Sequence, residues 1–224
     1  MSSVAISGNA SGAGVLTIAA PNTASSYTLT LPAATDTFVG KATTDTLTNK
    51  TLTSPTITGA AVSAMASSVI TSGTAVASTS GTSITFSSLP SWVKRVTVMF
   101  NGVSTSGTSS ILIQLGAGSV TNTGYASVGT RFGASSGASG NYTTGFGIFQ
   151  AAAADLIGGA IQLSNHSSNI WVAQGITSAT NSTANMTTSG YISLAGTLDR
   201  VVITTVGSPP TDTFDAGSIN ILYE

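Results

Sequence analysis

The sequence predicts an all-β protein. Three observations lead to this: apolar residues alternate with Ser or Thr at a period of two, no segment sustains a 3.6-residue apolar period, and Gly, Ser and Asn clusters separate the short apolar runs. In Arg95–Phe100, for example, Val96 and Val98 point one way and Thr97 points the other. The chain is therefore expected to consist of short strands joined by turns, with little helix.

Residues 82–224 are expected to form a compact C-terminal β-sandwich domain, jelly-roll-like in type, because several short strands with turn signals between them are typical of that architecture. About 140 residues suffice to bury one sandwich core. Asn101-Gly102 directly follows the predicted strand Arg95–Phe100, and this pair of residues predicts a tight turn there. The predicted strands are Ser83–Ser87, Arg95–Phe100, Ser110–Leu115, Thr144–Phe149, Ala160–Leu163, Ile170–Ile176, Tyr191–Leu194, Val201–Val206 and Ser218–Tyr223.

Residues 1–40 contain two further strand candidates, Val15–Ile18 and Tyr27–Leu31. Pro21-Asn22 begins the turn between them, and Pro32 ends the second. Both faces of the first strand are weakly apolar, and so short a segment cannot bury enough area to offset its ordering entropy. It needs a partner, most simply another copy of itself.

Residues 41–81 form a Thr-rich segment that is expected to be a shaft or linker. Leu47, Leu52 and Ile57 recur every five residues and are predicted to stack on the axis of three intertwined chains. Threonine suits such winding because it is β-branched and its hydroxyl can bond across strands. Two alternatives remain: a Thr-rich linker without fixed structure, and a short helix around Ala60–Val69.

The composition excludes several classes of function. Only 6% of residues are charged, against about 25% in an ordinary globular domain, while Ser and Thr together make up 72 of the 224 residues. The net charge is −1 and the six Lys and Arg residues are scattered, so no basic patch for nucleic acid is present. There is no Cys for a disulfide framework and no run of about 18 apolar residues for a membrane span.

Several segments resemble tail-fibre and other virion appendage proteins of tailed bacteriophages. They are GVLTIAAPNTASSYTLTLP near the N-terminus, TDTLTNKTLTSPTI at Thr44–Ile57, ITFSSLPSWVKRVTVMFNGVSTSG at Ile84–Gly107, ILIQLG at Ile111–Gly116 and the closing AGSINILYE. The resemblance spans most of the chain. It implies a homotrimer with a virion-bound N-terminus and a distal β-sandwich that meets the host surface.

We therefore expect a non-enzymatic structural protein of the virion surface, without cofactor or metal. Residues 1–40 would anchor it to another virion protein, residues 41–81 would trimerise, and residues 82–224 would contact a host glycan or protein. The lack of a secretion signal at the N-terminus fits release by lysis. Because the chain is short for a long tail fibre, a capsid decoration or head fibre without a specific receptor is the alternative, and a depolymerase tailspike is a weaker one.

Two loops are predicted to form the receptor-binding surface, Val120–Gly129 and Gly133–Thr144. Tyr125 and Tyr142 are flanked by small polar residues in them, so both rings are expected to be exposed, and exposed tyrosines are favoured at binding sites. Arg131, which lies between the loops, is included in the predicted site. Trp171, by contrast, is predicted to belong to the core.

One pattern matches a serine hydrolase. Gly133–Gly137 reads G-x-S-x-G, and Asp155 and His166 follow in the chain order of an α/β-hydrolase triad. A nucleophile elbow needs a strand before it and a helix after it, whereas this pattern lies in a Gly/Ser loop with no α/β alternation. The match is therefore attributed to composition.

Other arrangements of polar residues are no stronger. Asp155 and Asp199 are candidates for a glycosidase pair, but no spacing singles them out. His166 is the only histidine, so a histidine metal site would require three copies of the chain. Asp212 and Asp215 offer too few oxygen ligands for a hard cation and are better explained as turn residues.

Overall fold

The computed structural model describes residues 11–12, 23–26, 51, 53, 70–133 and 137–224. The chain divides into two compact units, Met1–Thr58 and Gly59–Glu224. In the first unit, the Ser25 N–H donates to Thr23 Oγ1 at 3.1 Å. The following predictions lie outside the described residues: the strands Val15–Ile18 and Tyr27–Leu31, the helix at Ala60–Val69, and the axial positions Leu47, Leu52 and Ile57.

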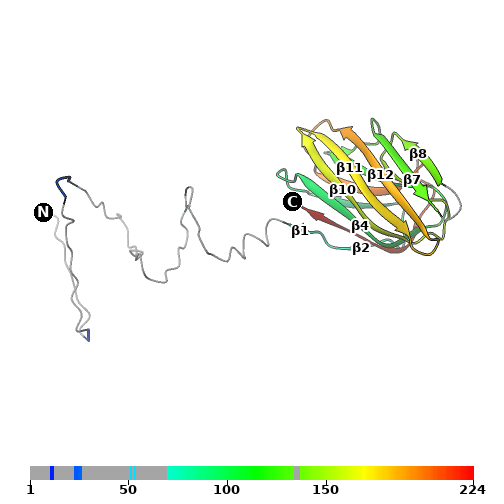
Figure 1. The fold of residues 1–224 in the computed structure, drawn as a ribbon, viewed down its shortest axis with the longest axis horizontal. Coiled ribbons are helices and arrows are strands. Elements are labelled where there is room, and N and C mark those ends of the chain that lie inside the picture. The colour runs from blue at the N-terminus through cyan, green and yellow to red at the C-terminus, as the bar shows by residue number, and fades with distance from the viewer. Residues whose placement is uncertain (1–10, 13–22, 27–50, 52, 54–69, 134–136) are drawn as a thin grey trace. The chain divides into compact units, whose positions relative to one another are not determined.

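The second unit confirms the all-β prediction, because every regular element in its described part is a strand and the strands form two antiparallel sheets (Figure 1). In spatial order, the larger sheet contains β1 (Thr71–Ser72), β14 (Phe214–Tyr223), β4 (Arg95–Thr105), β10 (Ile157–Ser167), β11 (Ile170–Ala179), β12 (Ala184–Ser193), β7 (Ala126–Phe132) and β8 (Gly137–Tyr142), with β2 (Val76–Ala77) also paired to β14. The smaller sheet contains β3 (Ser83–Ser87), β13 (Arg200–Thr205), β5 (Ile111–Ala117) and β6 (Ser119–Val120), with β9 (Phe146–Ile148) also paired to β5.

All nine predicted strands of this region are present, and six of them are longer than predicted. The structure adds β1, β2, β6, β7 and β8, which are short or rich in Gly and Ser. Because β1 and β2 both pair with β14, these two strands belong to the larger sheet, although they fall within the shaft or linker predicted for residues 41–81. The predicted boundary at residue 82 therefore lies inside the compact unit, which begins at Gly59.

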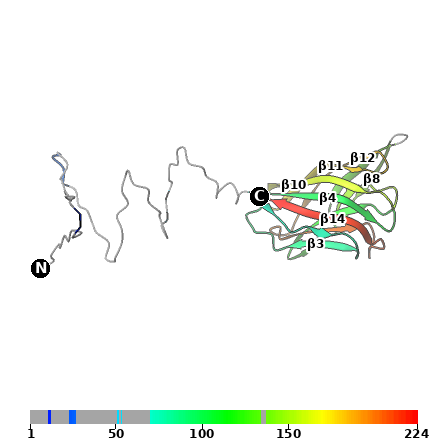
Figure 2. The ribbon, with the colours of Figure 1, turned by 90° about the horizontal axis from the view of Figure 1, so that it is seen from below.

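Buried side chains from both sheets form one apolar cluster. Val96 and Val98 of β4 contribute to it from the larger sheet, and Ile113 and Leu115 of β5 contribute from the smaller one. Each fully buried side chain of this size stabilises the fold by about 1.5–3 kcal/mol relative to exposure. Trp171 is buried in the same cluster, as predicted. Figure 2 shows β3 on one side of the domain and β10, β11 and β12 on the other.

Polar bonds also join the two sheets at β9. The Gly147 N–H of β9 donates to Ser127 Oγ at 3.2 Å, and the Gly147 carbonyl accepts from Thr188 Oγ1 at 2.8 Å. Ser127 and Thr188 belong to β7 and β12 of the larger sheet. The backbone of this short strand thus has its polar groups satisfied inside the domain, which buried peptide groups require.

The predicted turn at Asn101-Gly102 is wrong. Both residues lie inside β4, which continues to Thr105, and the pairing of β4 with β14 shifts register nearby. Gly102 has φ +61° and Gly217 of β14 has φ +86°, so the two glycines serve a β-bulge. A turn and a bulge both need positive φ, and the local sequence does not distinguish them.

Candidate ligand-binding face of the larger sheet

The predicted exposure of Tyr125 is wrong, because this side chain is only 3% exposed. Its Oη accepts a hydrogen bond from the Leu115 N–H at 2.7 Å and donates to the Thr121 carbonyl at 3.0 Å. Its ring meets Phe146 edge to face, with ring centroids 5.1 Å apart. Burial raises the pKa of Tyr125 to about 12, against a smaller lowering by the bond from the Leu115 backbone. Tyr125 therefore links β5 of the smaller sheet to the segment that leads into β7.

Tyr142 is half-buried and also points toward the smaller sheet. Its Oη donates to Ser110 Oγ at 2.8 Å. The ring lies against glycines: an added Cβ at Gly147 would come within 2.2 Å of it and one at Gly140 within 3.0 Å. Burial raises the pKa of Tyr142, and the bond with Ser110 opposes this. The missing Cβ atoms thus make room for the Tyr142 ring.

Arg131 forms an ion pair inside the domain. Its Nη1 lies 2.7 Å from Asp155 Oδ2, and the side chains of Arg131 and Asp155 are 13% and 1% exposed. Asp155 also accepts from Ser182 Oγ at 2.7 Å and from the Ala152 N–H at 3.2 Å. Burial raises the pKa of Asp155, but the bonds from Ser182 and Arg131 and the charge of Arg131 outweigh it, so the pKa lies below its ordinary value.

All three predicted receptor residues therefore face inward. Arg131 and Tyr142 lie on β7 and β8, the last two strands of the larger sheet, where side chains alternate between the faces, and Tyr125 directly precedes β7. In β7 the inward positions are Ser127, Gly129 and Arg131, whereas Val128 and Phe132 are exposed. The hydrophobic pattern of this strand is inverted, so the usual assumption that apolar residues point inward selects the wrong face.

The outer face of the larger sheet carries the residues that sequence reasoning missed. Directly paired residues of antiparallel neighbours project on the same side, so a row can be followed across seven strands. We call it the outer row; it consists of Leu222, Thr97, Gln162, Gln174, Ser189, Val128 and Asn141, each paired with the next. A second row beside it consists of Asn220, Met99, Ala160, Ile176, Thr187, Thr130 and Ser139.

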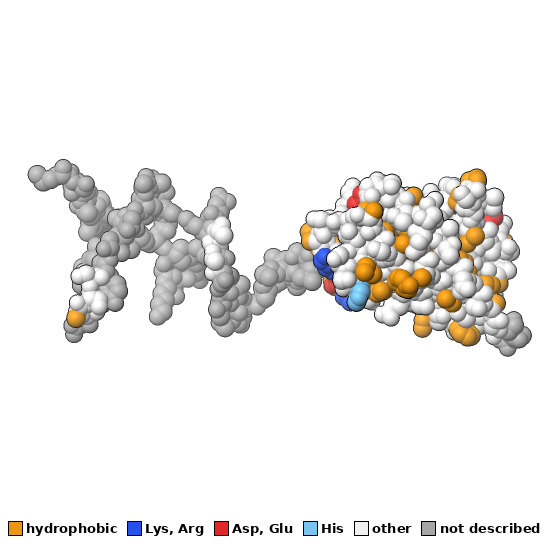
Figure 3. Space-filling view, turned by 90° about the horizontal axis from the view of Figure 1, so that it is seen from above, with side chains coloured by type: hydrophobic (Ala, Val, Ile, Leu, Met, Phe, Trp, Pro, Cys, Tyr) orange, Lys and Arg blue, Asp and Glu red, His pale blue; other side chains and the backbone are white. Residues whose placement is uncertain are grey.

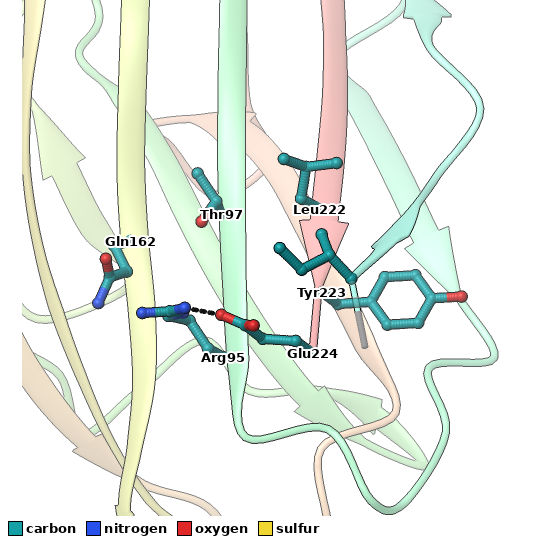
Figure 4. A pocket seen from close by; sticks show the side chains of 7 residues that line it. Arg95, Thr97, Gln162, Leu222, Tyr223 and Glu224 are labelled. Carbon is teal, nitrogen blue, oxygen red and sulfur yellow. Dashed lines mark ion pairs between the residues drawn. The ribbon is translucent and has the colours of Figure 1, made fainter. Parts of the chain in front are cut away.

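Two adjoining hollows lie along the outer row. One, of about 520 Å³, is lined by Gln174 and Ile176 and lies within the size range of small-ligand sites. The other, of about 270 Å³, reaches Arg95 and the chain end at Glu224. Both hollows include Thr97 and Gln162, so they are continuous. Figure 4 shows Gln162 and Thr97 projecting from neighbouring strands beside the Arg95–Glu224 ion pair.

Neither row contains a charged residue. The charged groups that line the hollows are Arg95 and Glu224, and these pair with each other. In the view of Figure 3, Lys and Arg atoms are visible at only one end of the domain, and most of the described surface is uncharged polar or apolar. The outer face thus offers hydroxyl and amide groups among apolar side chains, with no charged side chain in either row.

The central residues of the G-x-S-x-G pattern, 134–136, lie outside the described residues. The elements on either side of the pattern, β7 and β8, are both strands, whereas a nucleophile elbow needs a strand followed by a helix. Asp155 forms an ion pair with Arg131, and Asp199 forms one with Arg200, in which Asp199 Oδ1 lies 2.7 Å from Arg200 Nε. The pKa of Asp199 is lowered, mainly by the hydrogen bond from Arg200.

The candidate metal ligands are likewise separate. His166 is exposed on β10. Asp212 accepts the Ser109 N–H at 2.8 Å, which lowers the pKa of its carboxyl, and Asp215 accepts from Ser104. Among the described residues, no group of three or more His, Asp or Glu side chains is placed to hold a metal ion.

Comparisons with protein-family models, curated proteins and solved structures found no match for this chain. The described part of the chain also contains no helix of sufficient length and hydropathy to cross a membrane.

Proposed function

We propose that this protein is a structural fibre protein of a bacteriophage virion, anchored by its N-terminal segment, and that its C-terminal domain binds the host surface. The observation that carries the proposal is the outer face of the larger sheet. It exposes amides, hydroxyls and a few apolar side chains over seven strands without a charged member in either row. Such a surface is suited to recognition, and the resemblance to virion appendage proteins supplies the setting.

The domain is proposed to be a jelly-roll-like β-sandwich. The chain passes between the two sheets repeatedly, from β3 to β4 to β5 to β7 and later from β12 to β13 to β14. The shared apolar cluster lies where the inner faces of a sandwich would meet. This arrangement presents the outer face of the larger sheet to a partner while the core keeps it rigid.

A homotrimer is proposed because exposed apolar side chains gather where the described part of the domain begins. Ile70 and Trp92 are 52% and 51% exposed, and the Trp92 and Tyr223 ring centroids are 6.0 Å apart. The charged residues Lys94 and Arg95 follow Trp92, giving the apolar centre and polar rim that are typical of subunit interfaces. Three chains that converge at Ile70 would cover these side chains.

The full chain is expected to have a solution mass near three times 22.1 kDa in light scattering after size exclusion. The Trp92→Asp trimer should dissociate at a higher protein concentration than the wild-type trimer does, because the substitution places a charge in the apolar centre of the proposed interface. The control is Val120→Asp, which changes an exposed valine of the smaller sheet. A monomeric wild-type chain would contradict the trimer, and equal behaviour of the two variants would remove Trp92 from its interface.

Fluorescently labelled full chain is expected to bind some strains in a panel of bacteria and not others, saturably, in flow cytometry. Three weak sites in one trimer raise the apparent affinity without strong single contacts. Gln174→Lys should abolish binding by placing an unpaired charge on the outer face. Asn122→Lys, on the exposed surface of the opposite side, is the matched control. Uniform binding to every strain, or to none, would count against host recognition.

A further inference from the structure

We infer that the outer row binds a linear, uncharged polysaccharide that lies across the strands. This inference rests on the proposed function, binding to the host surface. That function leaves open whether the receptor is a glycan or a protein, and the inference names the class of ligand. The contact residues with free hydrogen-bonding capacity are Thr97, Gln162, Gln174 and Ser189, which lie on four consecutive strands of the larger sheet.

The spacing of these residues matches a polymer of sugars. Neighbouring strands lie about 4.8 Å apart, which is close to the length of one pyranose unit along a linear polysaccharide. A polysaccharide that lies across β4, β10, β11 and β12 therefore contacts one polar side chain at each sugar unit. The two hollows that share Thr97 and Gln162 run in the same direction and give the polymer a continuous path.

The hydrogen-bonding groups also match. A glutamine amide offers a donor and an acceptor side by side, which is what two neighbouring sugar hydroxyls require. Within the described part of the chain, Gln174 makes no side-chain hydrogen bond, and the Gln162 oxygen makes none either. Gln162 Nε2 donates to Ser164 Oγ at 3.0 Å, which orients the amide before a ligand arrives.

The apolar residues of the face complete the site. Tyr191 is 59% exposed and pairs directly with Val172, two residues along the strand from Ser189. Its ring offers the flat apolar surface with a polar tip on which a sugar face can stack. Ile176, in the larger hollow, adds an apolar wall.

The lack of charge selects against other ligands. An acidic polysaccharide or a nucleic acid would need cations, and the one cation among the described residues that line the hollows, Arg95, is neutralised by Glu224. A protein surface of ordinary composition is about one-quarter charged, and the two rows have no charged groups to pair with it. An uncharged glycan leaves no buried charge unpaired.

The test is an array of purified bacterial polysaccharides, neutral and acidic, probed with the full chain. Neutral polysaccharides should bind, and Gln162→Ala and Gln174→Ala should each weaken binding about tenfold, the effect of losing two neutral hydrogen bonds. Asn122→Ala, on the opposite surface, should bind as the wild type does. The solution mass of each variant should equal that of the wild type, because the row is a ligand site and not a subunit contact.

Treatment of cells separates this inference from the proposed function. Binding should be lost after periodate, which cleaves the vicinal diols of glycans, and should survive proteinase K. Loss after proteinase K alone would overturn the glycan inference while host binding stands. Selective binding to acidic polysaccharides would also overturn the glycan inference. A changed solution mass of the Gln174→Ala chain would overturn it too, because the outer face would then be a contact with a second copy of the chain.

Discussion

Replacement of Asp155 by alanine is expected to lower the free energy of unfolding by about 3 kcal/mol, the effect of breaking a buried ion pair. The carboxylate is 1% exposed and joins three segments, through Arg131 of β7, Ser182 before β12, and the backbone of Ala152. Without it the Arg131 guanidinium stays inside with no counter-charge. Urea unfolding followed by the fluorescence of the buried Trp171 measures the change.

Asp199→Ala is the matched control, since Asp199 is also paired with an arginine but at the surface, where ion pairs contribute little. Its unfolding midpoint should stay close to that of the wild type. A midpoint for Asp155→Ala that is equally close to the wild-type value would show that the buried pair does not stabilise the domain.

Replacement of Asp155 by asparagine gives an independent prediction about the pH dependence of stability. The pKa of Asp155 is lower in the folded than in the unfolded chain, so its contribution is fully present above the unfolded value, about 3.9, and is lost as pH falls through the folded value. The stability gap between wild type and Asp155→Asn should therefore be constant near neutral pH and should narrow below about pH 4. A gap that widens on acidification would contradict this assignment.

Gly217→Ala is expected to destabilise the domain by about 3 kcal/mol, at the upper end of the cost of a strained backbone conformation. Gly217 has φ +86°, and an added Cβ would come within 2.4 Å of the Gly102 carbonyl oxygen and 2.5 Å of the Asn101 carbonyl oxygen. These are backbone atoms of the adjoining strand, so they cannot move aside without breaking the β4–β14 pairing. Thermal unfolding followed by circular dichroism measures the loss.

Gly102→Ala separates the two causes, because Gly102 has φ +61° but nothing within 4 Å of an added Cβ. It carries the conformational strain without the clash, so the expected loss is about 1 kcal/mol. Equal losses for the two variants would mean that the close approach of the strands at the bulge contributes nothing.

The sequence by itself determined the all-β class and the strands whose apolar residues follow the pleat. In β4, Val96 and Val98 are buried as the period-two pattern predicts, and Trp171 lies in the core. These predictions succeed because burial of alternating apolar residues is a local property of a strand packed on one face. The predicted axis of Leu47, Leu52 and Ile57 remains a prediction, because these residues lie outside the described part of the chain.

The tertiary structure alone decided where the polar residues go. β7 and β8 have weak strand signals, and they are extended because β7 pairs with β12 and β8 pairs with β7. Tyr125, Tyr142 and Arg131 therefore form contacts inside the domain. A different pairing, that of β10 with β11, aligns Gln162 with Gln174, which lie twelve positions apart in the sequence on either side of a turn. Register between strands is set by contacts distant in sequence, which is why a face built from one residue per strand becomes visible only after folding.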